Sequence, residues 1–135
     1  MNQVNYQKEL EKILNTLQEK GEATSDYRPP RLFLHSCCAP CSSYCLEYLC
    51  RYFLITVFYY NPNISFSEEY RKRVAEQKRL IAAYNKEEKG WPIDIVEGDY
   101  EPERFYEMAK GYENCPEGGE RCFCCFDLRL RRTAE

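Results

Sequence analysis

The chain has 135 residues, a formal net charge of −3 and nine cysteines, and its length predicts a single domain. Apolar residues make up 44% and charged residues 30%, as in ordinary globular proteins, and the slight acidity excludes a generally basic nucleic-acid binder. No apolar run approaches the roughly 18 residues of a membrane span, and residues 1–20 lack the apolar core of a signal peptide. We therefore predict a cytoplasmic protein with no membrane partner.

The first thirty residues predict a helix and a linker ahead of the main domain. Apolar residues recur at helical spacing over 3–19, Gly21 ends that pattern, and the polar stretch 22–30 closes with two prolines. We expect the segment 1–30 to dock on a main domain that spans residues 31–135.

Predicted strands alternate with predicted helices in the main domain. Strands are expected at 31–35, 52–60 and 93–97, and helices at about 42–50, 65–86, 102–111 and from 122 onward. This alternation predicts an α/β fold, a three-layer arrangement of a parallel sheet with flanking helices on both faces.

Three features at helix ends carry further expectations. Ser42 or Ser43 is expected to cap the helix that starts near it, and Ser65 with Glu68 matches a capping box for the next one. The last helix is still running at Glu135, so we expect the chain to be incomplete at its C-terminus.

The cysteines are too numerous and too clustered for ordinary packing. Their number is odd, nothing points to export, and cytosolic thiols stay reduced, so a disulfide framework is not expected. They form two tight groups about 80 residues apart. The groups are Cys37, Cys38, Cys41, Cys45 and Cys50, and then Cys115, Cys122, Cys124 and Cys125. This pattern predicts a metal or cluster site that the fold closes.

The first group follows the first main-domain strand and leads into a helix. Ligands of open α/β sheets bind at the carboxyl ends of the strands, and a helix N-terminus lowers the pKa of nearby thiols. Cys37, Cys38 and Cys41 are therefore placed where sulfur binds metal well. On the last helix, Cys122 and Cys125 are spaced i, i+3 and can face the same centre. We interpret Cys45 and Cys50 as core thiols, and we assign no role to Cys115 and Cys124.

The pairing of Cys-Cys-x-x-Cys with Cys-x-x-Cys leaves three alternatives open. All-thiolate ligation suits an iron–sulfur cluster, or a structural zinc in a module that binds tRNA or protein without catalysis. A helix-opening Cys-x-x-Cys is also a redox motif, which predicts a thiol–disulfide enzyme with no metal. Iron–sulfur protein is brown and zinc protein is colourless, so metal analysis separates these alternatives.

The remaining polar residues give weaker signals. The single histidine, His35, excludes a His-rich zinc site and a Ser-His-Asp triad, and no phosphate-binding loop is present. Two basic groups could contact phosphates, or could be solvated helix faces, since acidic residues are interleaved with the first group. These groups are Arg71, Arg73, Lys78 and Arg79, and then Arg129, Arg131 and Arg132.

Several collinear motifs between residues 31 and 135 resemble the signatures of the QueH-type epoxyqueuosine reductases. The motifs are Leu34-His35-Ser36-Cys37-Cys38-Ala39-Pro40-Cys41-Ser42, Tyr60-Asn61-Pro62-Asn63-Ile64, Glu69-Tyr70-x-x-Arg73, Asp99-Tyr100, Gly119-Glu120-Arg121-Cys122-x-x-Cys125 and Arg129-Leu130-x-x-Thr133-Ala134. The resemblance implies a nucleotide-hydrolase-like (Rossmann-like) fold and the reduction of epoxyqueuosine to queuosine at the anticodon wobble position of tRNA. It also implies an electron donor, whose identity is unknown.

The resemblance further implies a [4Fe–4S] cluster and a second iron. Cys37, Cys38, Cys122 and Cys125 would hold the cluster, with sulfurs within roughly 7 Å of one another. Cys41 is the candidate for a second metal or redox role. Asp99, Glu120 and Tyr60 are the candidate proton donors. Family members are expected to be longer, with a C-terminal Cys-x-Cys redox pair that this chain lacks.

Overall fold

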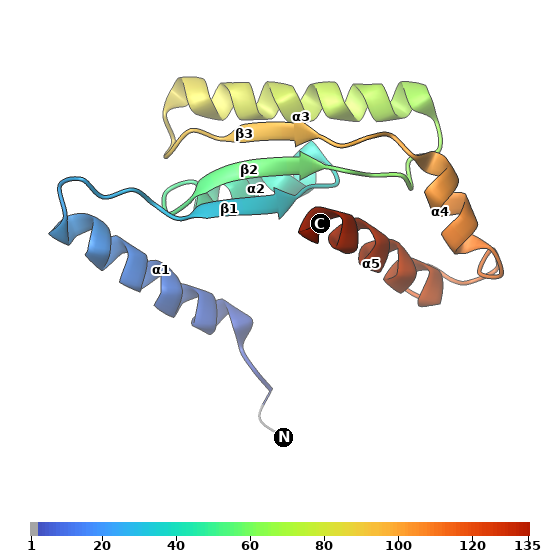
Figure 1. The fold of residues 1–135 in the computed structure, drawn as a ribbon, viewed down its shortest axis with the longest axis horizontal. Helices are drawn as coiled ribbons and strands as arrows, with labels where there is room; N and C mark the ends of the chain where they lie inside the picture. Colours follow the sequence, from blue (N-terminus) through green and yellow to red (C-terminus); the bar gives the residue numbers. More distant parts are fainter. Residues whose placement is uncertain (1–2) are drawn as a thin grey trace.

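The computed structural model describes residues 3–135 as an α/β domain with three strands and five helices (Figure 1). The strands are β1 (Arg31–His35), β2 (Leu54–Tyr59) and β3 (Asp94–Glu97). The helices are α1 (Tyr6–Ala23), α2 (Ala39–Leu49), α3 (Ser67–Glu87), α4 (Pro102–Ala109) and α5 (Glu120–Ala134). The expected segment 1–30 corresponds to α1 and its linker, and its first two residues lie outside the described residues.

The three strands form one parallel sheet in the order β1-β2-β3. Arg31 pairs with Leu54 and Thr56 pairs with Asp94, so the carboxyl ends of all three strands lie at one edge. The predicted α/β class with a parallel sheet is confirmed. Strand β2 is shorter than expected, because Tyr52 and Phe53 lie in the turn that follows α2.

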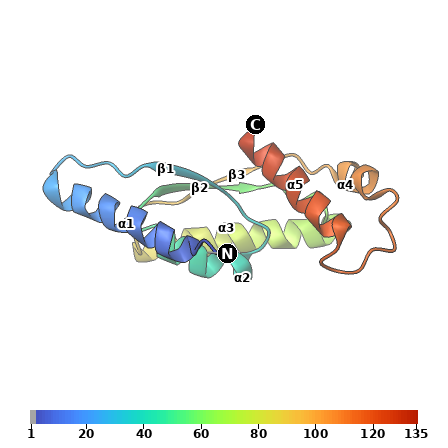
Figure 2. The same ribbon diagram turned by 90° about the horizontal axis from the view of Figure 1, so that it is seen from below.

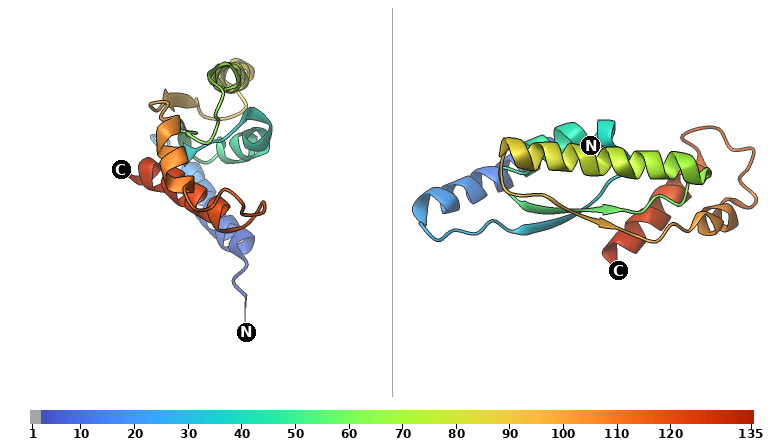
Figure 3. Two further views of the ribbon diagram at one scale, coloured as in Figure 1. Left: turned by 90° about the vertical axis from the view of Figure 1, so that its right-hand side faces the viewer. Right: turned by 90° about the horizontal axis from the view of Figure 1, so that it is seen from above.

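Helices α2 and α3 cover the same face of the sheet, as Figures 2 and 3 show. Two successive crossovers that advance in one direction place both helices on one side. The core between these layers is built from Leu46 of α2, Ile55 and Val57 of β2, and Ile81 of α3. On the other face Phe33 and Val96 each remain 47% exposed. Helix α5 contacts β1. Its C-terminus lies on the side of the sheet opposite α2 and α3 (Figure 2).

The helix starts differ from the sequence expectations at two places. Helix α2 begins at Ala39, with Cys38 at the N-cap, because Pro40 is tolerated in a first turn that needs no N–H donor. Ser42 and Ser43 therefore lie inside the helix, and their predicted capping role is wrong. Helix α3 begins at Ser67 after Phe66, with no side-chain cap, so the predicted capping box is also wrong.

Helix α1 contributes little to the buried core. Its N-cap is Asn5, whose side chain accepts a hydrogen bond from Lys8 N at 3.1 Å, and Leu14 is its one buried residue. Across residues 3–135, no helix combines the length and the apolar character that crossing a membrane requires.

Candidate metal centre

The first cysteine group gathers three sulfurs at the carboxyl end of β1. Cys37, Cys38 and Cys41 place their Sγ atoms within 4.8 Å of one another, and the first two are 3.8 Å apart. Cys38 is the N-cap of α2, so Cys41 lies in the first helical turn beside it. The described cysteines are all free thiols. We call these three residues the cysteine trio.

Two thiols of the trio, those of Cys38 and Cys41, do not hold their protons equally. Burial alone would raise the pKa of Cys38, but hydrogen bonds from Cys41 and Cys37 and the charge of Arg73 lower it below its ordinary value. The pKa of Cys41 rises to about 11, chiefly because its thiol donates to Cys38. Cys38 thus ionises before Cys41, and a thiolate is the form that binds metal.

Hydrogen bonds from β2 and the turn after it hold the cysteine loop in place. Ser36 N donates to Phe58 O at 3.1 Å, and the Asn61 amide donates to Ser36 O at 2.9 Å. The His35 ring donates from Nε2 to Tyr60 O at 2.7 Å, and burial lowers the pKa of His35. His35 is therefore a neutral, bonded residue that fixes the loop.

The second cysteine group opens helix α5 at the same end of the molecule. Cys122 Sγ accepts a hydrogen bond from Gly118 N at 3.3 Å, and Gly118 has a φ of +83°, which glycine adopts without strain. Cys125 is 7% exposed, and burial raises the pKa of its thiol against the opposing charge of Arg129. Neither sulfur belongs to the trio, so the four-ligand centre stays a prediction.

Arg129 connects the two cysteine groups. This side chain is 7% exposed and donates to Asn61 Oδ1 and Cys125 O, each at 3.4 Å. Asn61 in turn holds Ser36, directly before the trio. Two cavities, of about 240 and 220 Å³, open beside the first and second groups, and Phe126 and Arg129 line both.

The structure corrects the expectation for part of the basic surface. The sequence suggested that Arg129 could contact phosphates, but its side chain is buried and does not face the solvent. Of the other basic residues, all but Arg71 form ion pairs with acidic neighbours among the described residues, which favours the alternative of a solvated face. The pairs are Arg73 with Glu69, Lys78 with Glu97, Arg79 with Glu76, Arg131 with Asp127, and Arg132 with Glu135.

None of the candidate proton donors lines the cavities at the trio. Asp99 and Glu120 are exposed. Tyr60 is fully buried, and its pKa is raised by burial and by Glu101, with Arg104 nearby. Their roles stay predictions.

Among the remaining cysteines, Cys50 is confirmed as a core thiol at 1% exposure. Cys45 is exposed and lines the cavity beside the trio, so its predicted core role is wrong.

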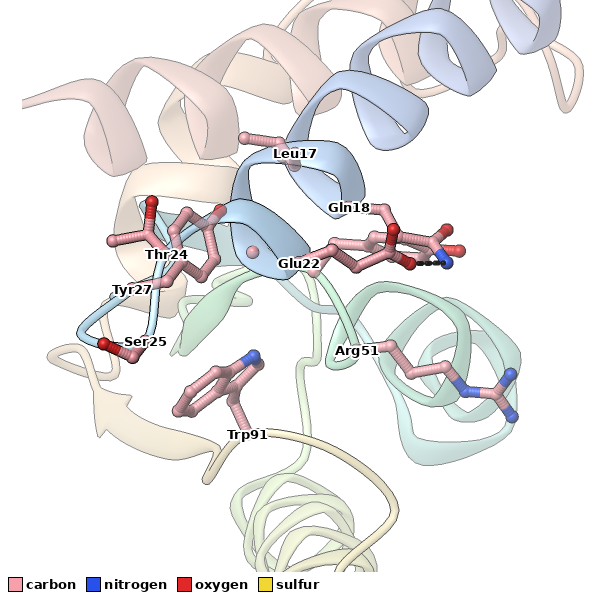
Figure 4. A pocket seen from close by; sticks show the side chains of 10 residues that line it. Leu17, Gln18, Glu22, Thr24, Ser25, Tyr27, Arg51 and Trp91 are labelled. Atoms are coloured by element: carbon pink, nitrogen blue, oxygen red, sulfur yellow. Dashed lines mark hydrogen bonds between the residues drawn. The ribbon is translucent and has the colours of Figure 1, made fainter.

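Another cavity, of about 540 Å³, lies at the opposite end of the sheet. Leu17 and Tyr27 from α1 and its linker, and Trp91 from the segment before β3, surround it (Figure 4). No cysteine lines this cavity. The chemistry-bearing residues are therefore at the carboxyl edge, and this amino-end cavity is separate from them.

Together the fold and the cysteine trio define an α/β domain with three thiols, suited to hold a metal, at the carboxyl edge of a parallel sheet. Residues 32–135 match the family described as "Epoxyqueuosine reductase QueH", and the chain belongs to this family.

Similar proteins carry the same description. The epoxyqueuosine reductase QueH of Staphylococcus epidermidis is 40% identical over 134 residues, which cover 98% of this chain and 53% of that protein. The corresponding protein of Staphylococcus aureus is 37% identical over the same shares, and that of Acinetobacter baylyi is 42% identical over 77% of this chain and 45% of its own. The chain thus spans about half the length of the curated relatives it matches. No solved structure matches the chain.

Proposed function

We propose that this chain carries the metal-binding part of an epoxyqueuosine reductase that acts on tRNA. The observation that carries the proposal is the cysteine trio at the carboxyl edge of the sheet, in a chain that belongs to the QueH family. Its relatives are named for epoxyqueuosine reduction, and the reaction is the proposed activity of the whole protein.

The donor set suits an iron–sulfur cluster. Thiolates are the ligands that such clusters take, and the trio supplies adjacent free thiols of which Cys38 ionises readily. We assign Cys37, Cys38, Cys122 and Cys125 to a [4Fe–4S] cluster. Cys41 then remains for a second iron or for a redox role. A buried phenol beside the trio, that of Tyr59, has no hydrogen-bond partner among the described residues, as expected of a group that faces a bound centre.

The chemistry requires two electrons and two protons, because the epoxide oxygen leaves as water and a carbon–carbon double bond forms. A bound cluster would supply the electrons one at a time, after receiving them from a separate electron donor. The chain's own residues would position the wobble nucleotide of tRNA and deliver protons. Asp99 and Tyr60 are the candidates for proton delivery.

Cysteine variants test this ligand assignment. Cys37→Ala and Cys125→Ala should each remove the visible absorption of anaerobically reconstituted protein and the reduction of epoxyqueuosine in tRNA. Cys50→Ala is the matched control, because this buried thiol packs against α2 and the turn before β3, far from the trio. It should keep both signals and cost about 1 kcal/mol or less of stability. Loss of colour in Cys50→Ala, with colour kept in Cys125→Ala, would contradict the assignment.

A further inference from the structure

The Tyr59 phenol is a buried polar group without a hydrogen-bond partner among the described residues, and it lies at the carboxyl end of β2, beside the strand that leads into the cysteine trio. The side chain is 0% exposed, and its Oη has no hydrogen-bond partner among residues 3–135. Asn61 lies close enough to lower the pKa of Tyr59, but the two side chains form no hydrogen bond of proper geometry, and the Asn61 amide instead donates to Ser36 O and accepts from Arg129. A buried hydroxyl without a partner costs about 1–3 kcal/mol, so such a group usually has a partner in the functional state.

The sheet geometry places Tyr59 on the face that α2 and α3 cover. Side chains alternate along β2, so Tyr59 points to the face that α2 and α3 cover, while Tyr60 points to the other face with Phe58. Tyr59 packs between Tyr70 and Val74 of α3 at the carboxyl end of the strand. Ser36 pairs with Phe58 next to it, so the two cysteines that follow Ser36 lead into α2 on the same side.

The charges around the phenol point to the same neighbours. Burial raises the pKa of Tyr59 to about 12, the charge of Arg73 opposes that rise, and the thiolates of Cys37 and Cys38 add to it. Arg73 also lines the cavity that opens at Cys38. The neighbouring phenol of Tyr60 responds instead to Glu101 and Arg104. Of these two adjacent tyrosines, therefore, Tyr59 is the one whose pKa responds to the thiols of the trio.

We propose that Tyr59 Oη donates a hydrogen bond to a sulfur of the metal centre held by the cysteine trio, and that it positions and tunes this centre. The inference rests on the proposed metal site and assigns to it a residue in addition to the cysteines. A donor to a ligand sulfur strengthens metal binding and raises the reduction potential of an iron–sulfur centre. The proton stays on the phenol throughout, because the pKa of Tyr59 lies far above neutral pH.

The test compares Tyr59→Phe with Tyr70→Phe in the full chain, with and without metal. Tyr70 belongs to the same aromatic cluster, but its Oη donates to Glu97 at 3.3 Å. In metal-free protein Tyr59→Phe should be at least as stable as wild type, since it removes an unsatisfied hydroxyl. In a Co²⁺ titration followed by thiolate absorption, it should bind about 10- to 100-fold more weakly. Its reconstituted cluster should have a lower midpoint potential.

Tyr70→Phe should show unchanged Co²⁺ affinity and midpoint potential, with only a small loss of stability in both states. Equal Co²⁺ affinity and equal potential in Tyr59→Phe and wild type would overturn the assignment of Tyr59 and leave the metal site standing. Wild-type protein that binds neither Co²⁺ nor iron would overturn the proposed metal site itself, and the role of Tyr59 with it.

Discussion

Substituting Arg129 tests how the two cysteine groups are joined. Arg129→Met keeps a long apolar side chain and removes the guanidinium, which leaves the buried Asn61 Oδ1 without its donor. An unsatisfied buried acceptor costs about 1–3 kcal/mol, and relief of the buried charge returns part of that cost. We therefore expect a net loss of about 1–2 kcal/mol, or roughly 3–8 °C in melting temperature for a domain of this size.

Urea denaturation of the reduced, metal-free protein measures this loss. The control is Arg131→Met on the same helix, whose side chain is 77% exposed and pairs with Asp127 at 2.7 Å. Such a pair contributes about 0–1 kcal/mol. In a double-mutant cycle, Arg129→Met and Asn61→Ala should be non-additive, because the two side chains are in contact. Equal losses in Arg129→Met and Arg131→Met, together with additivity in the cycle, would refute the connection.

Three further predictions concern packing, ionisation and tRNA. Gly90→Ala should cost about 1–3 kcal/mol in urea denaturation, since a Cβ there would lie 2.5 Å from Cys50 O, and an unchanged midpoint would refute this. Burial raises the pKa of Tyr70, so its contribution to stability is complete below pH 10, the ordinary tyrosine pKa, and falls as pH rises further. Tyr70→Phe should flatten that fall in an alkaline denaturation series, and an unchanged slope would contradict it. Arg71 and Lys72 have no ion-pair partner among the described residues and are therefore free to contact phosphates. Replacing both with Ala should lower the slope of log affinity for tRNA against log salt concentration by about 0.7 per lost phosphate contact. An unchanged slope would favour a solvated face.

Much of the architecture follows from local sequence signals. The apolar run at 31–35 and the β-branched run before Tyr60 predict strands because such residues pack well on a half-buried pleated surface. The alternation of strands with helices then requires parallel pairing, and parallel pairing places the cysteine loop at the carboxyl edge. The trio is thus predictable, since its members are close in sequence.

The features that the sequence did not reveal depend on neighbours distant along the chain. Arg129 reads as one more basic residue on a surface helix until the fold places it against Asn61, 68 residues away. The predicted capping box at Ser65 fails because a local preference for where a helix starts is weaker than the constraint that the fold places on the chain after β2. Which of Tyr59 and Tyr60 faces the helices depends on the alternation of side chains along β2, and this alternation can be predicted from the sequence. Tyr59 lies on the same face as Ile55 and Val57 of the core.

Metal and sulfide analysis of the anaerobically purified and reconstituted wild-type chain tests the central claim most directly. An iron–sulfur centre on the cysteine groups predicts brown protein with little zinc, with iron and acid-labile sulfide in equal amounts for the cluster alone and one further iron where Cys41 holds it. Replacing Cys38 with Ala should remove both iron and sulfide together. Colourless protein that holds zinc without sulfide would contradict the account, and would favour a structural zinc module instead.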